Sequence, residues 1–357
     1  MRLMIATDAW HPQINGVVRS LEYMAQQAPH FDAQVSFLTP QRFRSVPMPG
    51  YGEIRLSLVL PGMVERVLRE EVPTHVHIAT EGPIGFATRQ ACLRMGRTFT
   101  TSYHTRFPEY VSARVPVPED WTYRVLRRFH ASASVTMVST PSLERQLRER
   151  GFQHIRRWTR GVDTELFRPR ETRVLDVPGP VFLYVGRVAV EKNIEAFLSL
   201  DLPGTKVVVG DGPARQELQA KYKSALFLGA RTGEALAEIY ASADVFVFPS
   251  LTDTFGIVLL EALASGLPVA AFPVTGPLDV IEGSGCGVLD NDLQKAALAA
   301  LEISRSRCRA YGESFTWRES ARQFFSNIRT AQSATGEILS RDGISHFDCA
   351  ETVTELT

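Results

Sequence analysis

The sequence has no apolar run long enough to cross a membrane and no pattern of paired cysteines. Its most apolar stretch, residues 256–272, is interrupted by Glu261, Gly266 and Pro268, so we expect no spanning helix of about 20 residues. The first apolar residues are too few for a signal peptide and fit a strand better. The four cysteines are scattered, without a Cys-x-x-Cys pair: Cys92, Cys286, Cys308 and Cys349. This spacing favours the reducing cytoplasm and argues against a zinc site.

Lysine is absent from the first 170 residues, although the whole chain carries 39 basic and 39 acidic residues. Arginine supplies all 23 basic residues of this first half, against 15 acidic ones, which gives a net charge of +8. The rest of the chain has 16 basic and 24 acidic residues, a net charge of −8. A basic half on a neutral protein predicts an anionic surface or substrate facing that half.

Apolar runs bounded by turn residues alternate with amphipathic segments of helical length, which is typical of parallel α/β sheets. In the first half we expect strands at 3–6, 34–38, 75–78, 98–102 and 134–138, and helices at 17–28, 63–70, 84–95, 121–130 and 142–149. In the second half we expect strands at 181–185, 206–209, 225–228, 245–248 and 269–272. Because 357 residues suit two domains of about 150 residues, we predict two Rossmann-like domains facing each other across a cleft.

Prolines and charges interrupt this pattern between residues 167 and 180, so the domain boundary is expected there. The predicted domains are residues 1–170 and residues 171–316. Residues 317–335 are expected to form a helix that packs back on the first domain. Residues 336–357 are expected to form a polar tail, poorly ordered at its end.

The segment 248–262 combines the end of a strand, a polar loop and an apolar helix that should start near Gly256. Asp253 and Thr254 are expected at the helix cap, where backbone N–H groups can hold an oxyanion or a hydroxyl. Glu261 then lies more than one turn inside the helix, among leucines. A carboxylate is costly to bury without partners, and the hydroxyls of a ligand diol would be suitable ones. The alternative places Glu261 on a solvent-facing stripe.

This segment resembles the acidic motif of glycosyltransferase family 4, in which two carboxylates are separated by seven residues, as Asp253 and Glu261 are. The resemblance implies that Glu261 holds the ribose hydroxyls of a nucleotide-sugar donor. It also implies that Asp253, with the backbone of Phe255 and Gly256, holds hydroxyls of the sugar. The family's first acid is usually glutamate, so the shorter Asp253 puts the sugar contact in question.

The Asp-Thr-Phe-Gly version of the motif is similar to that of bacterial sulfoquinovosyl- and glycosyl-diacylglycerol synthases. The resemblance covers about residues 1–325 and implies the two-Rossmann-domain architecture called GT-B. It also implies that residues 1–170 bind the acceptor and residues 171–316 the nucleotide-sugar donor.

Arg187 and Lys192 follow the first strand of the second half, five positions apart across a turn. At this spacing both side chains could reach one diphosphate. Alternatively, Arg187 pairs with a surface acid and Lys192 merely starts a helix. The resemblance assigns both residues to the phosphates of the leaving nucleotide. The later Gly210-Asp211-Gly212-Pro213 loop is also typical of the family, and its glycines are expected to serve backbone geometry.

The first half contributes two further candidates, Gly16 and His104. Gly16 leads into the first helix, where the lack of a side chain would let the backbone approach a donor phosphate. A plain turn glycine is the alternative, because no G-x-G-x-x-G run occurs there. A lone histidine such as His104 is often structural, but the resemblance places it against the transferred sugar. Arg160 to Asp163 match the family's interdomain segment, with Asp163 structural.

The resemblance implies a retaining glycosyltransferase, with His104, Asp253, Arg187 and Lys192 as catalytic residues. Arg187, Lys192 and helix N-termini would stabilise the departing diphosphate. Without an enzymic nucleophile, retention implies attack on the front face of the sugar. No cofactor and no metal ion is expected, because the Asp-x-Asp triplet at 290–292 lies far downstream and fits a solvated loop.

The acceptor is expected to be a membrane lipid or glycolipid, such as diacylglycerol, and the donor a UDP-sugar. Clustered arginines support a lipid: Arg124, Arg127, Arg128, Arg145, Arg148, Arg150, Arg156, Arg157 and Arg160. Each basic residue near anionic lipid contributes about 1 kcal/mol, so the first domain could dock peripherally on the inner face of the cytoplasmic membrane. Arg124, Arg127 and Arg128 would face the membrane, with Trp121, Tyr123 and Phe129 entering it.

A solvated helix face is the alternative to the docking surface. Competing functions are a GDP-mannose-dependent mannosyltransferase, a sugar-nucleotide epimerase of the same architecture, and a non-enzymic nucleotide-sugar-binding protein. No nucleic-acid partner is expected.

Overall fold

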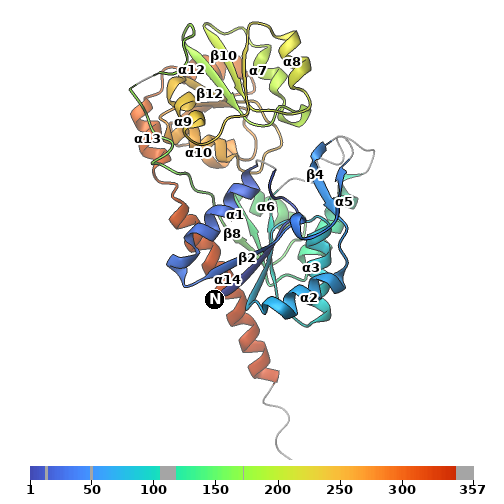
Figure 1. The fold of residues 1–357 in the computed structure, drawn as a ribbon. Coiled ribbons are helices and arrows are strands. Elements are labelled where there is room, and N and C mark those ends of the chain that lie inside the picture. Colours follow the sequence, from blue (N-terminus) through green and yellow to red (C-terminus); the bar gives the residue numbers. More distant parts are fainter. Residues whose placement is uncertain (13–14, 49–50, 105–117, 172, 343–357) are drawn as a thin grey trace, which may run out of the picture.

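The computed structural model describes residues 1–12, 15–48, 51–104, 118–171 and 173–342. Over these residues the chain forms two α/β domains, each built on a six-stranded sheet whose paired strands run parallel. Figure 1 shows the two domains one above the other, with the long α14 helix running down beside the first sheet. The predicted fold class is confirmed. No described helix combines the length and the apolar character needed to cross a bilayer.

The first sheet has the strand order β2-β1-β5-β6-β7-β8. Its strands are β1 (Arg2–Ala6), β2 (Gln34–Leu38), β5 (His75–Ile78), β6 (Thr100–Tyr103), β7 (Val135–Val138) and β8 (Ile155–Arg157). The main helices around it are α1 (Gly16–Gln27), α2 (Pro61–Glu71), α3 (Pro83–Arg94), α5 (Glu119–His130) and α6 (Pro141–Glu149). A separate antiparallel hairpin joins β3 (Ser45–Met48) to β4 (Tyr51–Ser57). Strands β5, β6 and β7 are buried along their whole length, as expected for a sheet covered on both faces.

The second sheet has the strand order β11-β10-β9-β12-β13-β14. Its strands are β9 (Val181–Val185), β10 (Thr205–Val209), β11 (Leu226–Gly229), β12 (Val245–Phe248), β13 (Val269–Ala271) and β14 (Gly287–Leu289). Its helices are α7 (Ile194–Leu198), α8 (Arg215–Lys221), α9 (Gly233–Ser242), α10 (Ile257–Ala264), α11 (Pro277–Ile281), α12 (Leu293–Ala300) and α13 (Arg305–Gly312). The chain leaves β9 toward β10 on one side and returns to pair β12 on the other. Ligands of such sheets bind at this switch point, outside the carboxyl ends of the strands.

The last helix, α14 (Trp317–Asp342), begins at the second domain and packs on the first. Phe324 and Phe325 are fully buried in a core that includes Leu3 and Ile5 of β1. The Trp317 ring stacks on Tyr23 of α1 with ring centroids 4.3 Å apart. The helix runs past residue 335, where the sequence predicted its end, and the remaining tail at 343–357 lies outside the described residues.

The chain crosses between the domains twice, and the two crossings lie side by side. Val162 on the first crossing forms an isolated parallel bridge with Thr316 on the second, and its N–H donates to the Phe315 carbonyl at 2.9 Å. Gly161 lies so close that an added Cβ would be 2.4 Å from the Trp317 nitrogen. The two segments that link the domains therefore run side by side and are hydrogen-bonded to each other.

Candidate active site

Two loops of the second domain meet at the switch point of its sheet. One loop follows β9 and carries Arg187 and Lys192, and the other follows β12 and carries Asp253. Because β9 and β12 are neighbouring parallel strands, both loops leave the same edge of the sheet. The loops are bonded to each other: the Lys192 Nζ lies 2.6 Å from the Asp253 Oδ1, and the Asn193 side chain donates to the Pro249 carbonyl at 3.1 Å.

Arg187 lies in the middle of the β9 loop and is partly exposed. Its Nε is 4.0 Å from the Glu191 carboxylate, at the outer limit of an ion pair. The loop around it is supported by Gly210, whose φ is +144° and whose added Cβ would lie 1.8 Å from the Gly186 carbonyl oxygen. A side chain at Gly210 would displace the loop, so this glycine serves backbone geometry, as the sequence predicted.

The acidic helix, α10, starts at Ile257 with Gly256 as its cap residue in a left-handed conformation, φ +81°. An added Cβ at Gly256 would lie 3.1 Å from the Phe248 ring, so glycine is needed on both counts. The prediction that Asp253 and Thr254 cap this helix is wrong, because both lie in the loop before Gly256. Thr254 instead donates through its hydroxyl to the backbone carbonyl of His104, at 2.6 Å, in the other domain.

Glu261 is buried inside α10, with 2% of its surface exposed. One carboxylate oxygen is paired with the guanidinium of Arg19, on α1 of the other domain, and the other accepts from the Tyr240 hydroxyl at 3.0 Å. Burial raises the pKa of Glu261, and the Arg19 charge acts against that rise. The alternative that Glu261 lies on a solvent-facing stripe is therefore wrong.

Gly16 opens α1 and faces the start of α10. An added Cβ at Gly16 would lie 3.3 Å from the Cδ1 atom of Ile257. The preceding Asn15 caps α1 by accepting from the backbone N–H groups of Val17 and Val18, each at 3.0 Å. The two helix starts that the sequence assigned to the donor, α1 in one domain and α10 in the other, therefore lie against each other.

His104 lies at the end of β6 and is also buried, with 9% of its surface exposed. Its Nδ1 lies 2.8 Å from an Arg160 Nη atom, and because a guanidinium can only donate, Nδ1 must accept. Burial, reinforced by the Arg160 charge, lowers the pKa of His104 well below the usual 6.5. The ring is therefore neutral, with its proton on Nε2, which has no hydrogen-bond partner among the described residues. The Nε2–H group is therefore a buried hydrogen-bond donor that the described residues leave unpaired.

Two known family models match most of the chain. Residues 14–166 match Glycosyltransferase Family 4, and residues 179–305 match Glycosyl transferases group 1. A GDP-mannose-dependent alpha-mannosyltransferase of Mycobacterium tuberculosis is 31% identical over 81% of this chain and 83% of its own length. The sulfoquinovosyl transferase SQD2 of Arabidopsis thaliana is 34% identical over 67% of this chain, but the match spans only 50% of SQD2.

The chain belongs to glycosyltransferase family 4. Its fold agrees with those of solved glycosyltransferases: sucrose-phosphate synthase of Thermosynechococcus elongatus superposes with a TM-score of 0.76 at 22% identity, covering 93% of this chain and 99% of that one. Anabaena HepE, solved with UDP and glucose, superposes with a TM-score of 0.69 at 16% identity, covering 92% and 99%. The two-sheet architecture is the GT-B fold.

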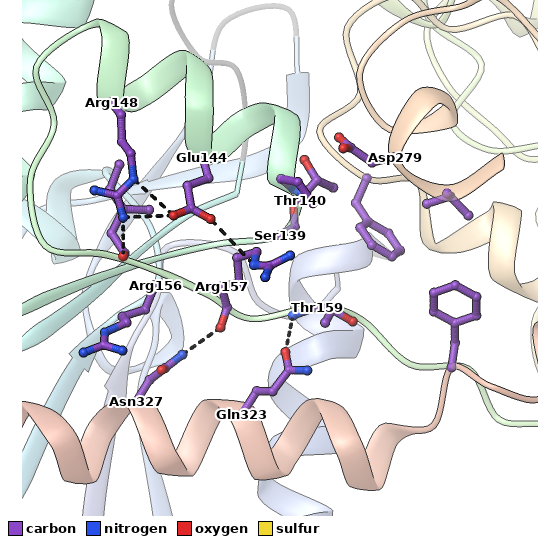
Figure 2. Close-up of a pocket in the computed structure, with 15 residues that line it drawn as sticks. Ser139, Thr140, Glu144, Arg148, Arg156, Arg157, Thr159, Asp279, Gln323 and Asn327 are labelled. Carbon is purple, nitrogen blue, oxygen red and sulfur yellow. Dashed lines mark hydrogen bonds and ion pairs between the residues drawn. The ribbon is translucent and has the colours of Figure 1, made fainter. Parts of the chain in front are cut away.

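The family 4 chain also has a cavity of about 800 Å³ between its domains, beside the edge strand β8. Figure 2 shows that its polar lining is largely paired with itself: Arg148 and Arg157 approach Glu144, and Asn327 donates to the Arg157 carbonyl. Phe255 is the only predicted donor residue among the residues that line it. The cavity therefore reaches the loop after β12 at Phe255, but Arg187, Lys192 and Asp253 are not among its lining residues.

The arginines predicted to face a membrane are on α5. Arg124 and Arg128 are exposed, while Arg127, also exposed, donates to the Arg150 carbonyl at 3.0 Å. Tyr123 and Phe129 belong to the core, with 4% and 1% of their surface exposed, so the prediction that they enter a membrane is wrong. The helix is amphipathic, and these two rings fall on its inner face.

The Asp-x-Asp triplet at 290–292 lies in the loop between β14 and α12, as the sequence predicted, and Asp292 caps α12. Asp292 accepts from the Lys295 N–H at 3.1 Å at the start of α12, and Asp290 pairs with the Lys295 ammonium at 2.7 Å. Within the described part of the chain, no group of three or more His, Cys, Asp or Glu side chains could hold a metal ion.

Arg19 and Tyr240 were missed by sequence reasoning, which sought ligand partners for Glu261 and not protein ones. The position of Arg19, a charge three residues after Gly16 on the first helix, was an available signal.

Proposed function

We propose that this glycosyltransferase retains the anomeric configuration and transfers a sugar from a UDP-sugar to a membrane lipid such as diacylglycerol. The observation that carries the proposal is the pair of bonded loops at the switch point, which groups Arg187, Lys192 and Asp253 at one edge of the second sheet. Two cations next to a carboxylate suit a donor with a diphosphate and a hydroxylated sugar.

Departure of the nucleotide is the demanding step of such a transfer. The bond from the anomeric carbon to the diphosphate oxygen breaks, and negative charge grows on the phosphate. Arg187 and Lys192 would stabilise this charge because they are already fixed by their loop. The acceptor hydroxyl would then attack from the same face, with its proton passing to the departing phosphate.

The Lys192–Asp253 ion pair affects how the donor would bind. When the donor binds, its phosphate would compete with Asp253 for the Lys192 ammonium, and its sugar hydroxyls would compete with Lys192 for the Asp253 carboxylate. The donor replaces one ion pair with two charge-assisted contacts, so the pair holds both side chains in place without excluding the ligand.

His104 would contact the transferred sugar. Its Nε2–H is a neutral hydrogen-bond donor at the carboxyl end of β6, suited to a sugar hydroxyl. Because the pKa of His104 is lowered, the ring would not act as a cationic acid near neutral pH.

GDP-mannose is the second candidate donor. The mannosyltransferase of Mycobacterium tuberculosis that is similar over most of both chains is named as GDP-mannose-dependent. Against this, the Asp-Thr-Phe-Gly motif favours the UDP-sugar subtype. The sulfoquinovosyl transferase SQD2 is 34% identical, compared with 31% for the mannosyltransferase, although over a shorter part of this chain.

The lipid acceptor is supported by the outer surface of the first domain. Arg124 and Arg128 lie on α5 near Trp121, which has 57% of its surface exposed, and Val125, which has 37%. Phe86 on α3, also exposed, packs edge-on against Phe129 of α5 with ring centroids 4.8 Å apart. Exposed apolar side chains between arginines fit an anionic bilayer surface.

The test is a transfer assay on the full chain with diacylglycerol in anionic vesicles. UDP-glucose, UDP-galactose, UDP-glucuronate, UDP-sulfoquinovose and GDP-mannose are supplied separately, and lipid products are identified by mass spectrometry. We expect a monoglycosyl lipid with one of the UDP-sugars and with the α configuration of its donor. A product with GDP-mannose alone would replace the UDP-sugar assignment, and release of free sugar without a glycolipid would overturn the lipid acceptor.

A further inference from the structure

An ion pair joins the two helices that begin at the donor site. Arg19 comes about one helical turn after Gly16 on α1, and Glu261 about one turn after Ile257 on α10. The contact between Gly16 and Ile257 at the helix starts therefore continues one turn further as the Arg19–Glu261 pair. Ile257 also packs against the cores of both domains.

Among the described residues of the first domain, Arg19 is the cation that pairs with the Glu261 carboxylate. The Tyr240 hydroxyl occupies the second carboxylate oxygen but carries no charge to balance it. An ionised carboxylate that is 2% exposed is costly without a cation. A carboxylate has about four acceptor positions, so Glu261 can keep Arg19 and Tyr240 and still receive ligand hydroxyls.

We propose that Arg19 is a positioning residue of the donor site, which holds the Glu261 carboxylate in the orientation that receives the donor's ribose hydroxyls. This inference rests on the proposed function and on the role in ribose binding that the family resemblance implies for Glu261. Since Arg19 and Glu261 belong to different domains, donor affinity depends on the contact between α1 and α10. The second domain alone does not complete its own nucleotide site.

A simple bridge between domains would have different consequences, and the molecule contains one for comparison. Asp279 of α11 accepts from the Ser142 N–H at 3.0 Å and from the Ser142 hydroxyl at 2.9 Å, which links the second domain to α6 of the first. Within the described part of the chain, neither Asp279 nor Ser142 forms a hydrogen bond with a predicted donor residue. Asp279→Ala therefore removes an interdomain contact of similar extent without altering Glu261.

The pH dependence of nucleotide affinity further distinguishes a positioning role of Arg19 from a simple bridge between the domains. The groups that face Glu261 are Arg19 and Tyr23 of α1 and Tyr240 of α9, while Arg309 of α13 bonds the Ala264 carbonyl at the far end of α10. Loss of Arg19 removes the charge that opposes the raised pKa of Glu261, so the carboxyl takes up its proton at a higher pH. A protonated carboxyl accepts ribose hydroxyls less well, and affinity should then fall as the pH is lowered.

The experiment titrates UDP and GDP by calorimetry into the full-length wild type, Arg19→Gln, Arg19→Lys and Asp279→Ala, at pH 8 and pH 6. We expect Arg19→Gln to bind the preferred nucleotide about tenfold more weakly at pH 8, the loss of one charged hydrogen bond, and weaker still at pH 6. Arg19→Lys should recover most of the affinity, and Asp279→Ala should bind like the wild type at both pH values.

Thermal unfolding of each variant checks that it is folded, and Arg19→Lys keeps the charge if Arg19→Gln does not fold. Wild-type affinity in Arg19→Gln at both pH values would overturn the inference, as would equal weakening of Arg19→Gln and Asp279→Ala. If neither nucleotide bound the wild type, the proposed function would fail, and this inference with it. If the wild type binds a nucleotide and only these results for the variants fail, the proposed function stands and only the role of Arg19 is overturned.

Discussion

Glu261 in the second domain and His104 in the first are both buried, and each is bonded to an arginine, yet the arginine has opposite effects on them. Arg19 opposes the burial of Glu261 and favours its charged form, whereas Arg160 adds to the burial of His104 and favours its neutral form. Both oxygens of Glu261 are bonded, but one nitrogen of His104 has no partner among the described residues. The same type of neighbour thus prepares a charged acceptor in one domain and a neutral donor in the other.

The two domains therefore contribute different chemical groups to the proposed site. The second domain supplies Lys192, Asp253 and Glu261, whose charges are already paired before the donor arrives: Lys192 with Asp253, and Glu261 with Arg19 of the first domain. The first domain supplies Arg19, which pairs with Glu261, and the neutral N–H group of His104. We therefore expect charge removal in the second domain to have larger effects than removal of the imidazole in the first.

The largest effect is expected from Lys192→Ala. In the proposed mechanism, Lys192 is one of two cations that would stabilise the departing diphosphate, so kcat should fall about 1000-fold. The measurement is a steady-state transfer assay at saturating donor. The matched control is Lys295→Ala, because Lys295 is also paired with an aspartate but lies on the surface of α12. Loss of less than tenfold in Lys192→Ala would contradict the assigned role.

His104→Ala should reduce kcat/KM about 100-fold, since it would remove the proposed hydrogen-bond donor to the sugar. His104→Gln keeps an N–H group at a similar reach and should restore part of the loss. Steady-state kinetics with both variants make the comparison. If His104→Ala were more damaging than Lys192→Ala, the division between the domains would be wrong.

The arginines of α5 should affect membrane binding rather than chemistry. Replacing Arg124 and Arg128 together with glutamine should weaken partition to anionic vesicles about 30-fold, from about 1 kcal/mol for each charge. Co-sedimentation at moderate salt measures this change. Replacing the exposed Arg318 and Arg322 of α14 with glutamine serves as the charge-matched control, and an equal loss there would remove α5 from the docking surface.

Lowering the pH from 8 to 6 should leave the ring of His104 unchanged. An ordinary histidine gains a proton as the pH falls through 6.5, but the lowered pKa of His104 keeps it neutral over this range. Nitrogen-15 shifts of the imidazole should stay those of a ring protonated on Nε2. A titration midpoint above pH 6 would contradict the proposed neutral donor.

The smallest effect is expected from removal of divalent metal. Activity should be unchanged by EDTA, because in the proposed mechanism Arg187 and Lys192 would take the place of a metal at the diphosphate. Activity lost with EDTA and regained with manganese would show that the charge balance of the second domain is incomplete without an ion.

Much of the fold could be predicted because the strands are short apolar runs between turn residues. All ten expected strands occur within two residues of their predicted ends. The hairpin β3–β4 and the three-residue strands β8 and β14 were missed. Residues 155–157 read Ile-Arg-Arg and carry no apolar run. Their strand forms by pairing with β7, which only the tertiary structure specifies.

The site was predicted in part for a similar reason. The spacing of Asp253 and Glu261 and the strand before Arg187 are local features that a sequence displays. The partners of these residues come from far along the chain: Arg19 is 242 positions from Glu261 and Arg160 is 56 from His104. Such pairings arise from domain packing, so local spacing could not reveal them.

The most direct test of this account is a crystal structure of the full chain with UDP or GDP bound. We predict the diphosphate in hydrogen-bond contact with Arg187 and Lys192, and the ribose hydroxyls on the Glu261 carboxylate between α1 and α10. A nucleotide seated in the cavity beside β8, with Arg187, Lys192 and Glu261 all without contact to it, would contradict the account.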